Sequence, residues 1–77
     1  MNKQRKKRIE QLIDQLSDML LKLEELRQEE EQAFENLPDS LKGSPKGEEM
    51  ENNISFIEGA ESDIDNARDE LQNIIDA

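Results

Sequence analysis

The sequence contains no cysteine, histidine, tryptophan or tyrosine, and its only aromatic residues are two phenylalanines. Without cysteine the chain forms no disulfide, and without histidine or cysteine it lacks the usual proton shuttle, the thiol nucleophile and most soft-metal ligands. Acid pairs such as Glu58 and Glu61 lie outside any predicted cleft, where they should titrate as ordinary surface carboxylates. We therefore expect no enzyme, no metal site and no cofactor.

Long apolar runs are also missing, the longest being Met19-Leu20-Leu21. A membrane span requires about 20 apolar residues. The basic start of the chain is followed by charged, amphipathic sequence, which is unlike the apolar core of a signal peptide. These features predict a cytoplasmic protein that is neither secreted nor inserted in a membrane.

Proline and glycine are scarce, and most of them lie in one short stretch. Both prolines and two of the three glycines fall in LPDSLKGSPKG, residues 37–47. Pro38 disfavours a helical conformation at Leu37, whereas Ser44 followed by Pro45 is typical of a helix N-cap and first helical position. The sequence predicts an all-α chain with two long helices, at about 3–36 and 45–76, joined by a loop at 37–44.

Apolar residues recur every three or four positions on both sides of this loop, which is a helical period. With Ile9 as heptad position a, the first helix carries an a/d stripe, and a second a/d stripe begins at Met50. If the chain folds back between residues 41 and 42, the numbers of facing residues add up to 83. The predicted layers are Ile9 with Ile74, Leu12 with Leu71, Leu16 with Ala67, Met19 with Ile64, Leu23 with Ala60, Leu26 with Ile57, Glu30 with Asn53, and Ala33 with Met50.

These layers predict a single domain, residues 1–77, folded as an antiparallel helical hairpin. Large residues meet small ones in three layers, and Glu30 and Asn53 form the one polar layer. This pair either specifies the register, because a shift by one heptad would place a polar group against an aliphatic one, or lies near solvent at an open flank of the hairpin.

The chain has more apolar residues than a two-helix interface covers. Outside the two stripes lie Ile13, Leu20, Phe34, Ile54 and Ile75 at position e, with Leu21 at f and Phe56 at g. So wide an apolar surface suits a bundle better than a two-stranded coil. We expect a homodimer of hairpins that forms a four-helix bundle with a two-fold interface. The alternative is that the extra apolar surface docks onto a different protein.

The net charge of −10 is unevenly distributed. Residues 1–8, the basic head, hold five of the ten positive charges, and the remaining chain carries five positive and twenty negative charges. The basic head either contacts the phosphates of a nucleic acid or lies against the negative C-terminal end of the second helix. Its basic residues are Lys3, Arg5, Lys6, Lys7 and Arg8.

The acidic remainder of the chain also permits two interpretations. It either offers carboxylates to a positively charged partner, in imitation of a nucleic-acid backbone, or forms an ordinary solvated helix surface. The candidate contact residues on the second helix are Phe56, Glu58, Glu61 and Asp65.

The connection between the helices resembles one found in small phage and prophage-encoded helical proteins of unassigned function. Their pattern is Asn-Leu-Pro-Glu/Asp-Ser-Leu followed by Ser-x-x-Gly-Glu-x-Met, and NLPDSLKGSPKGEEME at 36–51 is similar to it. The matching residues are Asn36, Leu37, Pro38, Asp39, Ser40, Leu41, Ser44, Gly47, Glu48 and Met50. The resemblance covers the loop and the helix starts, and it implies a phage setting and a helical hairpin.

Together these features predict a non-catalytic interaction protein that binds and modulates, or inhibits, a host or phage protein through an acidic helical bundle. A nucleic-acid accessory factor that uses the basic head is the first alternative. A purely structural oligomer is the second.

Overall fold

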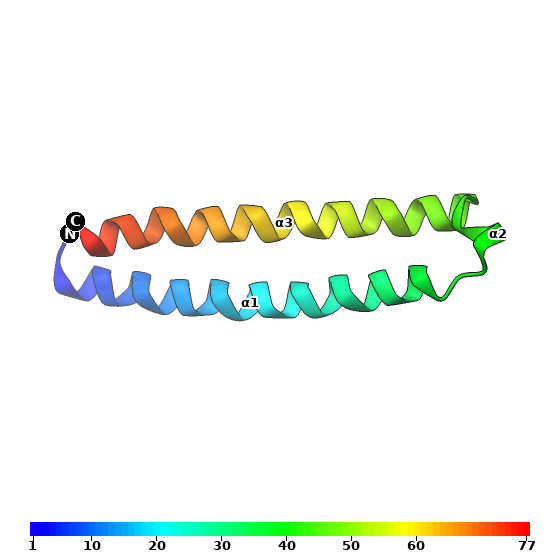
Figure 1. Cartoon of the computed structure of the whole chain (residues 1–77). Coiled ribbons are helices and arrows are strands. Elements are labelled where there is room, and N and C mark those ends of the chain that lie inside the picture. The colour runs from blue at the N-terminus through cyan, green and yellow to red at the C-terminus, as the bar shows by residue number, and fades with distance from the viewer.

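The computed structural model describes all 77 residues and contains three helices, α1 (Lys3–Glu35), α2 (Asp39–Lys42) and α3 (Pro45–Asp76). α1 and α3 lie side by side and run in opposite directions, so that the two ends of the chain meet at one end of a rod (Figure 1). The rod measures 58 × 15 × 13 Å. The predicted antiparallel hairpin is confirmed, and both long helices begin and end within one residue of the expected bounds.

No helix of the chain carries a stretch long and apolar enough to cross a membrane.

Both long helices begin at capped residues. The Asn2 side chain accepts a hydrogen bond from the backbone N–H of Arg5 at 2.8 Å, and Ser44 Oγ accepts one from the N–H of Gly47 at 3.4 Å. Ser44 Oγ also donates to the carbonyl oxygen of Leu41, and Pro45 occupies the first turn of α3. These bonds occupy N–H groups that have no partner inside the helix, which confirms the predicted start of α3.

Ser44→Ala should destabilise the hairpin by about 1 kcal/mol, the usual cost of losing a serine N-cap. The substitution removes both the cap of α3 and the bond to Leu41. Urea unfolding followed by circular dichroism measures the effect. Ser55→Ala is the matched control, because Ser55 is exposed in the middle of α3. Equal stability of the two variants would show that the cap contributes nothing.

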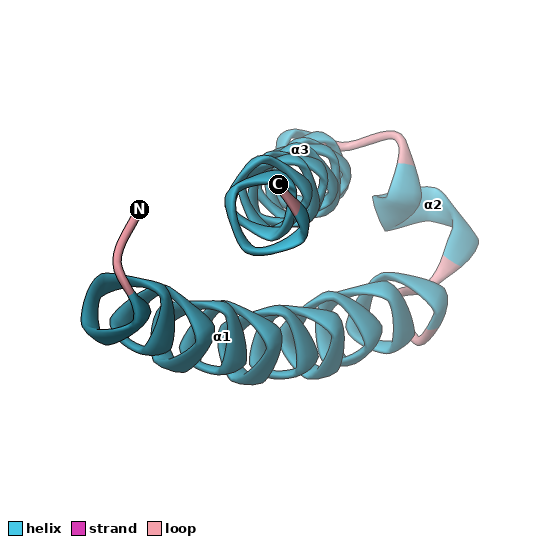
Figure 2. Ribbon diagram, turned by 90° about the vertical axis from the view of Figure 1, so that its left-hand side faces the viewer, coloured by secondary structure: helices cyan, strands magenta, loops and turns pink.

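The connection contains one turn of helix, α2, where only a loop was expected. Figure 2 places α2 beside the start of α3, at the end of the rod away from the chain termini. Lys42 of α2 reaches back over α1, with Nζ 5.8 Å from the centroid of the Phe34 ring and 3.8 Å from a carboxylate oxygen of Glu35. A cation over an aromatic face is attractive, so Lys42 links α2 to the last turn of α1.

Burial is concentrated at this same end of the rod. Gly47 and Met50 are the only two buried residues in the chain, and Met50 is 6% exposed. Leu37 is partly buried nearby, whereas Leu41 is 45% exposed. The remaining side chains that face the opposite helix are only partly buried. The hairpin alone therefore encloses no extended core.

The helix-facing side of α1 differs from the expected a/d stripe. Its predicted d residues are exposed, whereas three of the e residues are partly buried. The prediction is therefore wrong for the four layers that placed a d residue of α1 inside the hairpin. The exposed residues are Leu12, Met19, Leu26 and Ala33, and the partly buried ones are Ile13, Leu20 and Phe34.

Compared with the prediction, α1 is turned about its own axis so that its e residues, and not its d residues, lie toward α3. Its apolar surface spans positions a, d and e, and a single neighbouring helix covers only one flank of so wide a stripe. The polar bonds between α1 and α3 made by Arg27 and Arg68 lie on the e flank. These bonds join the two helices on the e flank, whereas no side-chain hydrogen bond joins them on the d flank.

Glu30 and Asn53 are both partly buried. No hydrogen bond joins their side chains, and the role of this pair in specifying the register stays a prediction.

Candidate interaction surfaces

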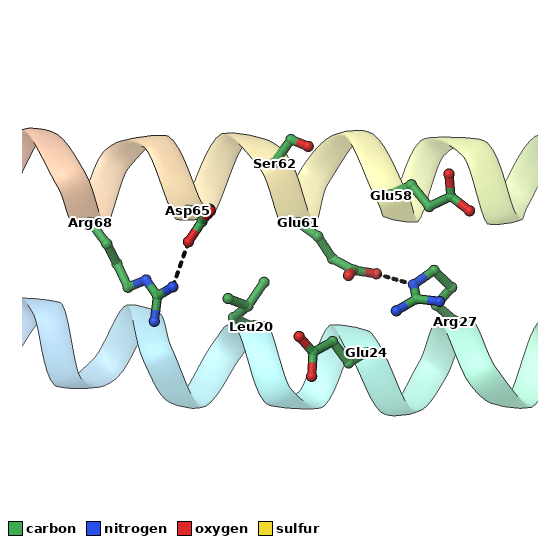
Figure 3. A pocket seen from close by; sticks show the side chains of 8 residues that line it. All are labelled: Leu20, Glu24, Arg27, Glu58, Glu61, Ser62, Asp65 and Arg68. Atoms are coloured by element: carbon green, nitrogen blue, oxygen red, sulfur yellow. Dashed lines mark hydrogen bonds and ion pairs between the residues drawn. The ribbon is translucent and has the colours of Figure 1, made fainter.

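An arginine on α1 forms the shortest polar link between the helices. Arg27 Nε donates to Glu61 Oε1 at 2.6 Å (Figure 3). Its Nη1 donates to Glu31 Oε1 at 3.0 Å. Arg27 occupies the e position that follows Ile13 and Leu20 on the covered flank of α1. The hydrogen bond to Glu61, and then that to Glu31, raise the pKa of Arg27 above its ordinary value. Charge-assisted bonds of this kind are short and strong.

Arg27→Gln should lower the urea midpoint of unfolding, because it breaks both ion pairs and leaves the Glu61 side chain, 15% exposed, without its cation. Lys22→Gln makes the same change in charge at an exposed α1 residue and is the matched control. We expect Arg27→Gln to lower the midpoint clearly more than Lys22→Gln. Equal midpoints would mean that the ion pair does not hold the flank closed.

A second arginine links the helices in the opposite direction. Arg68 of α3 donates from Nη1 to Ser17 Oγ of α1 at 3.0 Å and from Nη2 to Asp65 Oδ1 at 2.5 Å. Ser17 Oγ donates in turn to the carbonyl oxygen of Ile13 at 3.0 Å. Arg27 and Arg68 thus reach across the interface from opposite helices, at two separate levels of the rod.

The predicted acidic residues of α3 gather beside these two arginines. Glu58, Glu61 and Asp65 share an open polar groove between α1 and α3 (Figure 3). Two of the three carboxylates are already neutralised inside the hairpin, Glu61 by Arg27 and Asp65 by Arg68. Glu58 is exposed. The groove is lined by Leu20, Glu24, Arg27, Glu58, Glu61, Ser62, Asp65 and Arg68.

Phe56 lies on a different side of α3 from this groove. It is 76% exposed, the largest value among the big apolar side chains of the chain. Positions two, five and nine residues further on, occupied by Glu58, Glu61 and Asp65, point to the other side of an α-helix. The acidic residues nearest to Phe56 on its own side of the helix are Glu49 and Asp63, one heptad before and after it, and both are exposed. The structure therefore separates the predicted contact residues into two surfaces.

The basic head lies at the C-terminal end of α3, as one of the two interpretations expects. Lys6 is partly buried, and its Nζ donates to the backbone carbonyl oxygen of Ala77 at 3.4 Å. A cation at this position is favoured by the negative end of the helix dipole. The four other basic residues of the head, Lys3, Arg5, Lys7 and Arg8, are exposed.

Three exposed apolar residues on α1 form a surface that we call the α1 stripe. Leu12, Met19 and Leu26 are 48%, 50% and 54% exposed and follow one another at intervals of seven residues. Such intervals keep the side chains on one side of a helix. The stripe runs along the open flank of the hairpin, and an apolar hollow lined by Met1, Arg5, Arg8, Ile9 and Leu12 adjoins it.

Reasoning from the sequence assigned the α1 stripe to the inside of the hairpin and missed the links made by Arg27 and Arg68. A signal for Arg27 was available, since it lies in one heptad row with Ile13, Leu20 and Phe34. A charged residue in an otherwise apolar row calls for an opposite charge on the facing helix.

No protein-family model matches this chain, and neither do the curated proteins or the solved structures.

Proposed function

We propose that the chain is a non-catalytic interaction protein. Two hairpins associate into a homodimeric four-helix bundle, whose acidic outer surface binds and modulates a basic surface of a host or phage protein. The phage setting rests on the connection at residues 36–51, which resembles that of small phage-encoded helical proteins.

The observation that carries this proposal is the separation of charge and apolar surface between the two long helices. α3 contains ten acidic and two basic residues, a net charge of −8, and exposes Phe56 among them. α1 contains nine acidic and seven basic residues and carries the α1 stripe. α1 is thus suited to close contact between copies, and α3 to contact with a positively charged partner.

Phe56 and its acidic neighbours support binding by α3. Aromatic side chains are frequent energetic anchors of protein interfaces, and complementary charge around such an anchor accelerates encounter and favours the correct partner. Phe56 flanked by Glu49 and Asp63 offers this combination on one side of the helix.

Affinity capture from a lysate of the bacterial host tests the proposal. The unmodified chain should retain one basic protein, which is released as the salt concentration rises because exposed charges are screened. Phe56→Ser should lose it. Leu21→Ser is the matched control, since Leu21 is 59% exposed on α1, and it should retain the protein.

Two results would contradict the proposal. Recovery of material that disappears on nuclease treatment would indicate a nucleic-acid factor that acts through the basic head. Equal recovery by the Phe56→Ser variant would show that α3 does not present the binding surface.

A further inference from the structure

We propose that the α1 stripe is covered by α1 of a second copy of this chain, in antiparallel orientation, with Met19 at the two-fold axis. This inference rests on the proposed homodimer and names its surface and geometry.

The spacing of the α1 stripe suits a two-fold axis. Leu12 and Leu26 lie seven residues before and after Met19. In an antiparallel pair centred on Met19, Leu12 of each copy faces Leu26 of the other, and the two Met19 side chains face each other. A two-fold interface requires a surface that is complementary to itself in this way. The other flank of α1 is unsuitable, because its heptad row contains one apolar residue among Lys7, Asp14, Leu21, Gln28 and Glu35.

The exposed area of the hairpin is large enough for such an interface. The chain exposes 5813 Å² for a mass of 8.9 kDa, whereas a compact monomer of this mass exposes about 4,800 Å². The excess of about 1,000 Å² is comparable to the roughly 800 Å² that each partner contributes to a stable interface.

The charges along α1 fix the orientation of the two copies. Residues 3–13 contain five basic residues and one acidic residue, a net charge of +4, and residues 25–35 contain five acidic residues and one basic residue, a net charge of −4. An antiparallel pair centred on Met19 places these two segments opposite each other. A parallel pair would place each segment against its own copy, and like charges in contact are unfavourable.

Repulsion between like charges excludes α3 as the contact between copies. Two α3 helices would bring together two surfaces that each carry a net charge of −8. Pairing through α1 places the two copies of α3 on the outside of the bundle, where Phe56 and its acidic neighbours stay accessible.

One pair of oppositely charged residues beside the α1 stripe should meet between the two copies. Arg8 and Glu29 share a heptad row along the edge of the stripe, and both are exposed. In the antiparallel pair Arg8 of each copy lies next to Glu29 of the other, so the contact occurs twice. Facing charges at such edge positions set the orientation and choice of partner in helical coils.

Single-cysteine crosslinking tests this geometry, because the chain has no cysteine of its own. Met19→Cys treated with a short bismaleimide should form a crosslinked dimer in high yield. Leu12→Cys alone should give a yield about tenfold lower, since its two thiols would lie about 21 Å apart along the helix axes. An equimolar mixture of Leu12→Cys and Leu26→Cys should restore the yield, as a crosslink between the two variants. Leu21→Cys, on the other flank of α1, is the matched control and should crosslink poorly.

A charge exchange tests the orientation without a crosslinker. Arg8→Glu alone and Glu29→Arg alone should each weaken self-association by about tenfold or more, because each places like charges together twice. A mixture of the two variants should associate as a heterodimer about as tightly as the unmodified chain. If the two substitutions merely damaged the fold, mixing the variants would not restore association.

Each contrary result has a distinct meaning. If Leu12→Cys crosslinks to itself as well as Met19→Cys does, the pair is parallel and the inference fails. If the unmodified chain sediments as a dimer but Met19→Cys does not crosslink, the α1 stripe is the wrong surface, while the proposed homodimer stands. If the unmodified chain is a folded monomer, the homodimer and the inference both fail.

Discussion

Gly47→Ala should destabilise the hairpin by about 3 kcal/mol, the upper part of the usual range for overpacking. A Cβ atom at Gly47 would lie 2.8 Å from the carbonyl oxygen of Leu41 and closer still to the backbone of Lys42. Both obstacles are main-chain atoms, so they move only if α2 separates from the first turn of α3. Glycine is needed at position 47 because a side chain would not fit there. Its backbone conformation is open to any residue, since no glycine of the chain has a positive φ.

Urea unfolding at a fixed chain concentration measures this effect, with Gly59→Ala as the matched control. A Cβ at Gly59 would meet nothing within 4 Å. Replacing an exposed glycine in the interior of a helix by alanine should therefore stabilise the chain by about 0.5–1 kcal/mol. Opposite signs for the two substitutions would support the close approach of α2 and α3. A stabilising Gly47→Ala would show that they do not touch there.

Met19→Glu should raise the dissociation constant of the dimer by about 100-fold, which corresponds to about 2.8 kcal/mol. The substitution places two carboxylates against each other at the two-fold axis, in an apolar surface that offers them no partner. Sedimentation equilibrium over a range of chain concentrations measures the constant.

Leu21→Glu separates this effect from damage to the hairpin itself. Met19 and Leu21 are exposed to similar extents in a single hairpin, at 50% and 59%. If the hairpin acted alone, both substitutions would be ordinary surface changes of about 0.5 kcal/mol or less. Only an interface along the α1 stripe predicts a large effect at Met19 and almost none at Leu21, and similar dissociation constants for the two variants would contradict it.

The helices of this chain were predictable because local signals determine where they begin and end. Ser44 and Pro45 mark the start of α3, and Pro38 marks the end of α1, so the expected bounds agree closely with Lys3–Glu35 and Pro45–Asp76. The antiparallel arrangement followed from two heptad patterns of equal length. The turn α2 was missed, since four residues of helix between a proline and a glycine leave no periodic pattern.

The facing side of α1 was harder to predict, because apolar residues occupy three adjacent heptad rows. Periodicity alone does not distinguish a pair that uses Leu12, Met19 and Leu26 from one that uses Ile13 and Leu20. The choice depends on side chains that meet only after folding, namely Arg27 with Glu61 and Arg68 with Ser17. The same choice leaves the α1 stripe exposed, although its heptad spacing predicts residues that face the other helix.

Sedimentation equilibrium of the unmodified chain tests most directly whether one hairpin is only half of the folded assembly. A hairpin with two buried residues and an exposed α1 stripe should associate, and the mass should be twice the chain mass of 8.9 kDa. A helical, cooperatively unfolding species with a mass of 8.9 kDa at all concentrations would contradict the four-helix bundle.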